Sequence, residues 1–251
     1  MIIIKSPADV ARMRVSGEMA ATVLEKVAGS IRPGVETGEL DERARELMAG
    51  LGATSAFFGY RGYPGHICVS VNEEVVHGIP GKRRVQLGDV VSLDVGVVYD
   101  GFVGDTATTV LVGVTDPALL RLAAAGRRAL EAGISKAVAG GRLSDISHAI
   151  ETAAGDAGFS VVRDFVGHGV GRSMHEEPQV PNYGSPGRGP KLRTGMTLAL
   201  EPMLNLGSSE VEVLGDGWTV VTRDRKVSVH YEHTVVVCEG QAEILTLAKG
   251  K

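Results

Sequence analysis

A β-hairpin over residues 90–112 is the feature that most limits how this chain can fold. Asp100-Gly101 lies between two runs rich in β-branched residues. An Asp-Gly pair in that setting is the strongest short-range signal for a two-residue hairpin loop. Such a loop pairs Tyr99 with Phe102, so the register of the whole hairpin follows by counting outward from the loop.

The same register places two carboxylates on one face of the hairpin. Counting from the loop, Asp94 lies opposite Ala107, which is two residues from Asp105 on the second strand. Because side chains alternate between faces, Asp94 and Asp105 are diagonal neighbours, roughly 7–8 Å apart. Two like charges so close on an apolar hairpin are costly unless something positive lies between them. The hairpin therefore predicts a bound cation.

Composition excludes several classes of protein. The chain has 251 residues, 22% of them charged, with a net charge of −4 and a pI near 6.0, which gives no footprint for nucleic acid. Its 2 cysteines are far apart and form no CxxC motif, so neither a disulfide framework nor a thiolate zinc site is indicated. No apolar run approaches the roughly 18 residues of a membrane span, and the first residues do not form a signal peptide. We expect a cytoplasmic protein with no membrane or nucleic-acid partner.

One structural pattern occurs twice along the chain. Each half has a helix, a glycine break, a second helix and a glycine-led strand that ends in a carboxylate. Gly88 to Asp94 and Gly195 to Glu201 are both six residues apart, and the repeat period of about 106 residues is too long for a solenoid. The alternative is chance agreement of a few offsets. We expect one catalytic domain over residues 1–251, with duplicated halves at roughly 6–112 and 116–240.

Capping residues predict where the helices of each half begin. Ser6 and Asp116 each precede a proline, which favours the first position of a helix. Thr37 and Ser144 are the expected caps of the second helix in each half.

Four acids in strand-like sequence extend the cation hypothesis. They are Asp94, Asp105, Glu201 and Glu232, the last within a strand-like run at 227–237. His168 is expected in a glycine-rich turn at residues 167–171. A mixed set of carboxylate and imidazole ligands suits Mn, Fe, Co or Zn. Two divalent ions would neutralise four carboxylates and form a hydrolytic centre.

Several segments together resemble the bacterial type I methionine aminopeptidases, which are pita-bread metallopeptidases. The resemblance implies an α+β fold of two pseudo-symmetric halves, with a central curved antiparallel sheet covered by helices. The resembling segments are residues 60–64, 72–80, 94–96, 101–105, 167–171, 175–180, 201–203, 216–219 and 231–234.

The resemblance also implies a metal centre and an activity. The enzyme would remove the N-terminal methionine of nascent proteins and peptides whose second residue is small. A hydroxide bridging two divalent ions (Co, Mn, Fe, Zn or Ni) would attack the first peptide carbonyl. Glu201 would act as general base, and His77 and His175 would hydrogen-bond the substrate near the scissile bond. Asp105 and Glu232 would bridge the ions. The implied metal ligands are Asp94, Asp105, His168, Glu201 and Glu232.

A methionine pocket is implied in the same way. Two positions depart from the family pattern: Met174 stands where an aromatic residue is usual, and Arg61 replaces a histidine. Expected partners are nascent chains and the ribosome, and we expect a monomer. The implied substrate-binding residues are Tyr60, Tyr63, Cys68, His77, Met174, His175 and Trp218.

Two alternatives share the fold. An X-Pro aminopeptidase or dipeptidase would carry a long additional N-terminal domain, whereas the first helix cap here is Ser6. A binding module that has lost its metals would lack ligands, whereas all five ligand types are present. The 26 residues from His175 to Glu201 leave no room for the helical insertion of type II enzymes.

Overall fold

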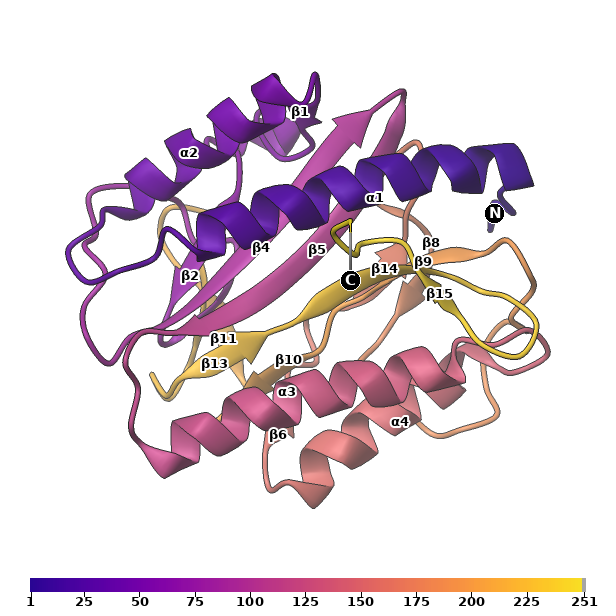
Figure 1. Ribbon diagram of the computed structural model, residues 1–251. Helices are drawn as coiled ribbons and strands as arrows, with labels where there is room; N and C mark the ends of the chain where they lie inside the picture. The colour runs from indigo at the N-terminus through magenta and orange to yellow at the C-terminus, as the bar shows by residue number, and fades with distance from the viewer. Residues whose placement is uncertain (250–251) are drawn as a thin grey trace.

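The computed structural model describes residues 1–249, in which helices lie against one face of an antiparallel nine-stranded sheet (Figure 1). The helices are α1 (Pro7–Ala28), α2 (Thr37–Gly50), α3 (Pro117–Lys136) and α4 (Leu143–Asp156), with a short 3₁₀ turn η1 (Tyr60–Gly62). The sheet comprises β1 (Thr54–Ser55), β2 (Cys68–Val71), β4 (Val90–Tyr99), β5 (Phe102–Leu111), β7 (Gly167–Gly169), β8 (Glu176–Val180), β9 (Thr197–Leu200), β14 (Glu232–Val236) and β15 (Glu243–Ile244).

Two three-stranded sheets complete the fold. One has the order β13 (Ser228–His230), β10 (Met203–Asn205) and β6 (Ser160–Val161), and the other β11 (Val211–Val213), β12 (Val220–Thr222) and β3 (Glu74–Val76). In the large sheet the path runs β1-β4-β5-β14-β9-β7-β8, with β2 paired to β4 and β15 to β14. Strands from the two halves of the sequence thus meet where β5 pairs with β14.

The predicted hairpin is confirmed in every pair. Tyr99 is paired with Phe102, and Asp94 with Ala107. Asp100 has a φ of 47° and Gly101 a φ of 74°, which is the left-handed backbone that a two-residue type I′ loop requires. Since the loop fixes the register, the relation between the two acids follows from local sequence alone.

Close packing of α1 on β5 decides which face of the sheet carries the acids. A Cβ on Gly104 would lie 2.5 Å from the backbone of Ser16 and 2.6 Å from Gly17 Cα, so only glycine permits this approach. Gly104 therefore faces α1. Asp105 is the next residue on β5, so its side chain projects from the opposite, helix-free face.

Apolar side chains fill the space between helices and sheet in two main clusters. One packs α1 and α2 on β2 and β4, and the other packs α3 and α4 on β9 and β14. In Figure 1 the α1–α2 pair lies above the α3–α4 pair on the same side of the sheet. Burying this face fixes the strands whose other face bears the polar residues described below.

Two of the four predicted helix caps are wrong. Ser6 and Asp116 cap α1 and α3 as expected. Thr37 and Ser144 are instead already within α2 and α4. Their hydroxyl groups bond to loops rather than to their own helices: the Thr37 hydroxyl donates to the Gly81 carbonyl, and that of Ser144 to a carbonyl at residue 188. Tertiary contacts thus take over groups that the local pattern assigns to capping.

The strand-like run at 227–237 is divided at Tyr231. β13 pairs with β10 in a small sheet, whereas β14 pairs with β5 and β9 in the large one. The Tyr231 N–H bonds to the Pro202 carbonyl, at 3.3 Å, between the two pairings. Glu232 is consequently the first residue of β14, which lies between β5 and β9 in the large sheet.

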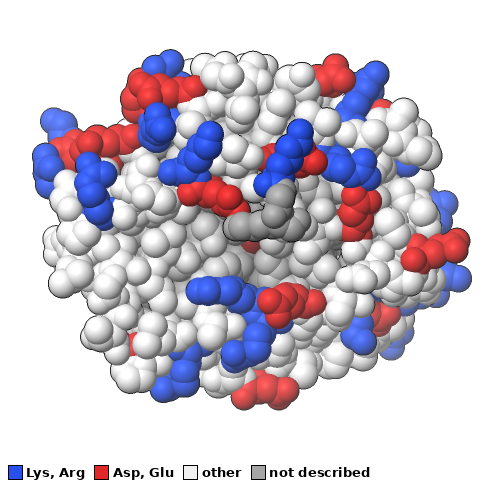
Figure 2. Space-filling view, viewed as in Figure 1, with Lys and Arg blue, Asp and Glu red and all other residues white. Residues whose placement is uncertain are grey.

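Charges of both signs are interspersed over the helical face of the molecule (Figure 2). That face therefore lacks the single-sign patch that nucleic-acid sites use. Within residues 1–249, no helix has the length and apolar character needed to cross a membrane.

Candidate metal centre

Strand register brings three of the predicted acids together. Asp94 on β4 is paired with Ala107 on β5, and Ala107 is in turn paired with Glu232 on β14. Directly paired residues point to the same face, and Asp105 lies two residues from Ala107 on the same strand. Asp94, Asp105 and Glu232 therefore share the helix-free face across three adjacent strands.

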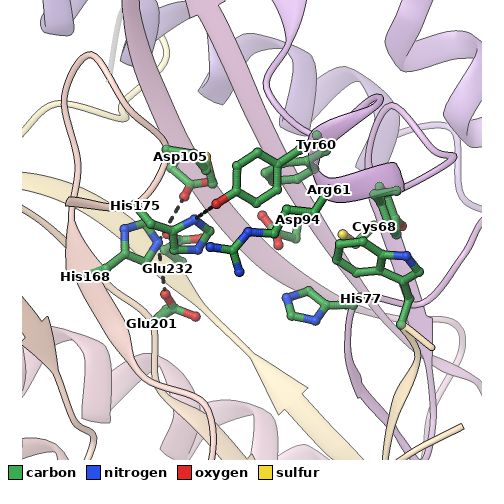
Figure 3. A pocket seen from close by; sticks show the side chains of 14 residues that line it. Tyr60, Arg61, Cys68, His77, Asp94, Asp105, His168, His175, Glu201 and Glu232 are labelled. Atoms are coloured by element: carbon green, nitrogen blue, oxygen red, sulfur yellow. Dashed lines mark hydrogen bonds and ion pairs between the residues drawn. The ribbon is translucent and has the colours of Figure 1, made fainter.

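His168 and Glu201 reach the same place from the next two strands. His168 on β7 is paired with Ala199 on β9, and Glu201 follows two residues later, just after β9 ends. The Nε2 atom of His168 lies 3.4 Å from Oε1 of Glu201 and 3.7 Å from Oδ2 of Asp105. Figure 3 shows these side chains converging on one point.

The His168 ring is oriented as a metal ligand. Its Nδ1 lies 2.9 Å from the carbonyl oxygen of Gly169. Because a carbonyl can only accept, Nδ1 carries the proton, and the lone pair of Nε2 faces the carboxylates. Burial lowers the pKa of His168 to about 4, so the ring is neutral at pH 7. A second hydrogen bond that fixes the tautomer in this way is typical of metal-binding histidines.

Without a cation, ionising these carboxylates together is unfavourable. Burial raises the pKa of Asp94 to about 7, and burial with the neighbouring acids raises the pKa of Asp105 and Glu232 well above their ordinary values. Burial raises the pKa of Glu201 in the same direction. Three buried oxygens have no hydrogen-bond partner: Asp94 Oδ1, Asp105 Oδ1 and Glu232 Oε1.

A divalent cation fits this cluster. Ligand atoms of Asp105, His168 and Glu232 lie within 4.8 Å of one another. Positive charge there would occupy the orphaned oxygens and the free Nε2 lone pair, and would favour the charged carboxylates. The donor set of carboxylates and one imidazole suits Mn, Fe, Co or Zn.

The cluster forms the floor of a cavity of about 210 Å³. This is small beside the roughly 300–1,000 Å³ of pockets for drug-sized ligands, so it holds little more than one side chain and the groups beside it. All twelve sequence-predicted site residues line it, together with Phe57 and Arg61. The fourteen are Phe57, Tyr60, Arg61, Tyr63, Cys68, His77, Asp94, Asp105, His168, Met174, His175, Glu201, Trp218 and Glu232.

One end of the cavity is apolar and enclosed. Phe57, Tyr63 and Cys68 are buried and in contact, and Trp218 packs against them. The Tyr63 and Trp218 rings meet edge to face with centroids 5.0 Å apart. Cys68 is paired with Asp94, so this apolar end adjoins the acids. Burial raises the pKa of the Cys68 thiol well above its ordinary value, which makes it a lining group rather than a nucleophile.

His77 and His175 line the same cavity as the acids. The Tyr60 hydroxyl lies 3.0 Å from Nδ1 of His175, and the rings of His175 and His168 have centroids 4.3 Å apart. His77 meets Trp218 edge to face at 6.1 Å. Burial lowers the pKa of His77 to about 4, so it is a neutral donor at pH 7.

Sequence reasoning missed Phe57 and the position of His230. His230 is 2% exposed, and its Nε2 has no hydrogen-bond partner and lies 3.9 Å from Oε2 of Glu201. His230 ends β13 and is paired with Met203, so its place beside Glu201 depends on long-range sheet pairing that no local pattern marks. No local pattern marks Phe57, whose position depends on packing against Tyr63.

Comparisons with known proteins agree with this geometry. The sequence profile of metallopeptidase family M24 matches residues 11–239. The methionine aminopeptidase of Clostridium perfringens is 48% identical over 249 residues, 99% of this chain and 100% of that protein. The crystal structure of methionine aminopeptidase from Thermotoga maritima has a TM-score of 0.96 at 48% identity, covering 98% of this chain and 99% of that one. Prolidase from Pyrococcus furiosus has a TM-score of 0.81 at 21% identity, over 98% of this chain and 66% of that one, which is a likeness of fold alone.

Proposed function

The chain belongs to metallopeptidase family M24 as a type I methionine aminopeptidase with the pita-bread fold, and we propose that it acts with two divalent ions at the cluster just described. The observation that carries this proposal is the convergence of three orphaned carboxylate oxygens with the lone pair of His168. Four carboxylates carry a charge of −4 when ionised, which two divalent ions would balance. The proposed ligands are Asp94, Asp105, His168, Glu201 and Glu232.

Position in the cluster suggests how the ligands divide. Asp105 and Glu232 lie in its middle and would contact both ions. His168 and Glu201, 3.4 Å apart, would complete one site, and Asp94 the other. When bound, the ions would polarise the peptide carbonyl and activate a water molecule for attack.

The substrate's methionine side chain would occupy the apolar end beside Tyr63, Cys68 and Trp218. Its free α-amine would then lie by Asp94, which adjoins Cys68 through strand pairing, and this would explain the need for an N-terminal residue. Because the cavity is only about 210 Å³, a second residue with a small side chain is expected.

Glu201 and the two histidines would handle protons and the carbonyl oxygen. Glu201 would take a proton from the attacking water and deliver it to the leaving amine nitrogen. His77 and His175, which line the same cavity, would donate hydrogen bonds to the substrate and to the oxygen on which charge develops. The bond between Tyr60 and His175 would fix the direction of that second donor.

We also propose the biological setting. All fourteen cavity residues come from this chain, so the proposed activity needs no second copy, and we propose a monomer. A substrate that is a nascent chain favours the cytoplasm and access near the ribosome. The family profile spans both sequence halves without a break, which supports one catalytic domain built from two related halves.

A peptide panel tests the proposal. Protein purified without oxygen and analysed for metal should release methionine from Met-Ala-Ser and Met-Gly-Met-Met in the presence of Mn²⁺ or Co²⁺. Release from Ala-Pro-Ser alone would favour an X-Pro peptidase. A protein that retains no metal and hydrolyses neither peptide would instead be a binding module.

A further inference from the structure

Arg61 occupies an unusual place at the cavity mouth. Of the fourteen lining residues, only Arg61 and His175 are exposed, so these two mark where the cavity opens to solvent. Arg61 is also the only one of the fourteen with a permanent positive charge. Figure 3 shows its guanidinium reaching across the site toward His175.

The guanidinium of Arg61 has no acid to balance it. Within residues 1–249 it has neither an ion pair nor a hydrogen bond, and its Cζ lies 5.4 Å from the centroid of the Tyr60 ring. Arg172, on a neighbouring loop, stacks on Phe102 at 4.3 Å and lies 3.5 Å from Asp9. Arg61 is thus free to pair with a carboxylate that enters the mouth.

The backbone holds Arg61 in place. Its φ of 48° and ψ of 26° are left-handed, a conformation that few residues other than glycine adopt. Hydrogen bonds close the turn around it: the Gly59 N–H bonds to the Tyr63 carbonyl at 2.9 Å, and the Tyr63 N–H to the Tyr60 carbonyl at 2.9 Å. The side chain therefore starts from a defined point beside the opening.

The route of a bound peptide passes this point. With the methionine side chain in the apolar end and the first peptide bond over the acids, the rest of the chain must leave by the exposed side. An extended peptide advances about 3.3 Å per residue, so the third and fourth residues would lie at the opening. Carboxylates there can form a charge-assisted pair with a guanidinium.

We propose that Arg61 is a specificity-determining residue that favours methionyl peptides with an acidic side chain at the third or fourth position. This inference rests on the proposed function of the same cavity. It concerns peptide binding rather than bond cleavage, so the effect belongs mainly in KM.

The test compares peptides that differ in one side chain. The substrates are Met-Ala-Xaa-Gly-Ser and Met-Ala-Gly-Xaa-Ser amides with Xaa as Glu, Gln or Lys. An exposed pair contributes roughly 0.2–1 kcal/mol, so in at least one series kcat/KM should fall from Glu to Lys by about 1.4- to fivefold. Salt at 0.5 M should shrink this ratio, because exposed charges are screened.

Variants distinguish an effect of Arg61 itself from the effect of other positive charges near the cavity. Arg61→Gln should equalise the peptides, Arg61→Glu should reverse their order, and Arg61→Lys should keep it. Arg172→Gln removes a charge from a nearby loop outside the cavity and should keep the wild-type order.

Three results would overturn the inference. They are equal rates for Glu and Lys peptides in the wild type, an unchanged order in Arg61→Gln, or the same loss in Arg172→Gln. No methionine release from any peptide would instead reject the proposed function.

Discussion

The ammonium group of Lys5 and the carboxylate of Glu176 form a buried ion pair that joins the N-terminal segment to the loop bearing His175. Their side chains are only 4% and 5% exposed. The other oxygen of Glu176 accepts the backbone N–H groups of Arg172 and Ser173 at 3.0 and 3.3 Å. This one carboxylate therefore organises the turn that precedes His175, and Lys5 holds the carboxylate.

Removing either partner should destabilise the protein and impair catalysis. A buried charge left without its partner costs about 3–5 kcal/mol, so Lys5→Met and Glu176→Gln should each lower the free energy of unfolding by that order. A looser His175 loop should reduce kcat while metal content stays the same. Denaturant unfolding of the metal-loaded protein, with kinetics on Met-Ala-Ser, measures both effects.

An exposed pair supplies the control for that experiment. Arg43 and Glu46 are 3.6 Å apart and about half exposed, so Arg43→Met should cost under about 1 kcal/mol. A Lys5→Met variant no less stable than Arg43→Met, with normal kcat, would show that the buried pair does not hold the loop.

The two central acids should be indispensable for metal binding. Asp105→Asn and Glu232→Gln should each abolish activity and lose at least one metal equivalent, because each replacement leaves a buried amide where a charged ligand is needed. Elemental analysis after gel filtration gives the metal content. Asp100→Asn is the matched control, since Asp100 is an exposed loop residue paired with Arg12 at 3.3 Å, and it should retain metal and activity.

His77 should affect catalysis without affecting metal. Its proposed role is to donate a hydrogen bond to the substrate, and loss of such a donor typically costs 10²–10³-fold in kcat. His77→Ala should therefore lower kcat by about that factor and keep the metal content of the wild type. Loss of metal from this variant would place His77 among the ligands and contradict the assignment.

How far the sequence predicts the site depends on the range of each contact. The pairing of Asp94 with Ala107 is local, because a two-residue loop fixes it. The place of Glu232 depends on the break at Tyr231, where the chain moves from one sheet to another, and no local pattern signals that move. The buried pair of Lys5 with a residue 171 positions away is equally invisible, since long-range packing alone creates it.

The surroundings of individual side chains were harder to predict than their membership of the cavity. Register and the resemblance together placed all twelve expected residues around one cavity. The unpaired state of Arg61 could not be foreseen, because it depends on which acids the fold leaves within reach. The burial of His230 beside Glu201 likewise follows from sheet pairing.

Metal affinity should rise with pH between about 6 and 8. Burial raises the pKa of Asp94 to about 7 and shifts the pKa of Asp105 and Glu232 upward as well, so the metal-free cluster holds protons that an ion must displace. The pKa of His168, lowered by burial to about 4, leaves that ligand already neutral over this range. The carboxylates therefore determine that metal affinity rises with pH. Each proton released makes binding about tenfold tighter per pH unit.

Calorimetry with Mn²⁺ at pH 6.5, in two buffers of different ionisation enthalpy, counts the released protons directly. We expect binding of the first ion to release at least one proton. The Asp94→Asn variant should release fewer, because its side chain keeps the same shape but cannot ionise. An affinity that is the same at pH 6 and pH 8, with no proton release, would mean that the carboxylates are already charged without metal. The orphaned oxygens would then have to be stabilised by groups other than a bound cation.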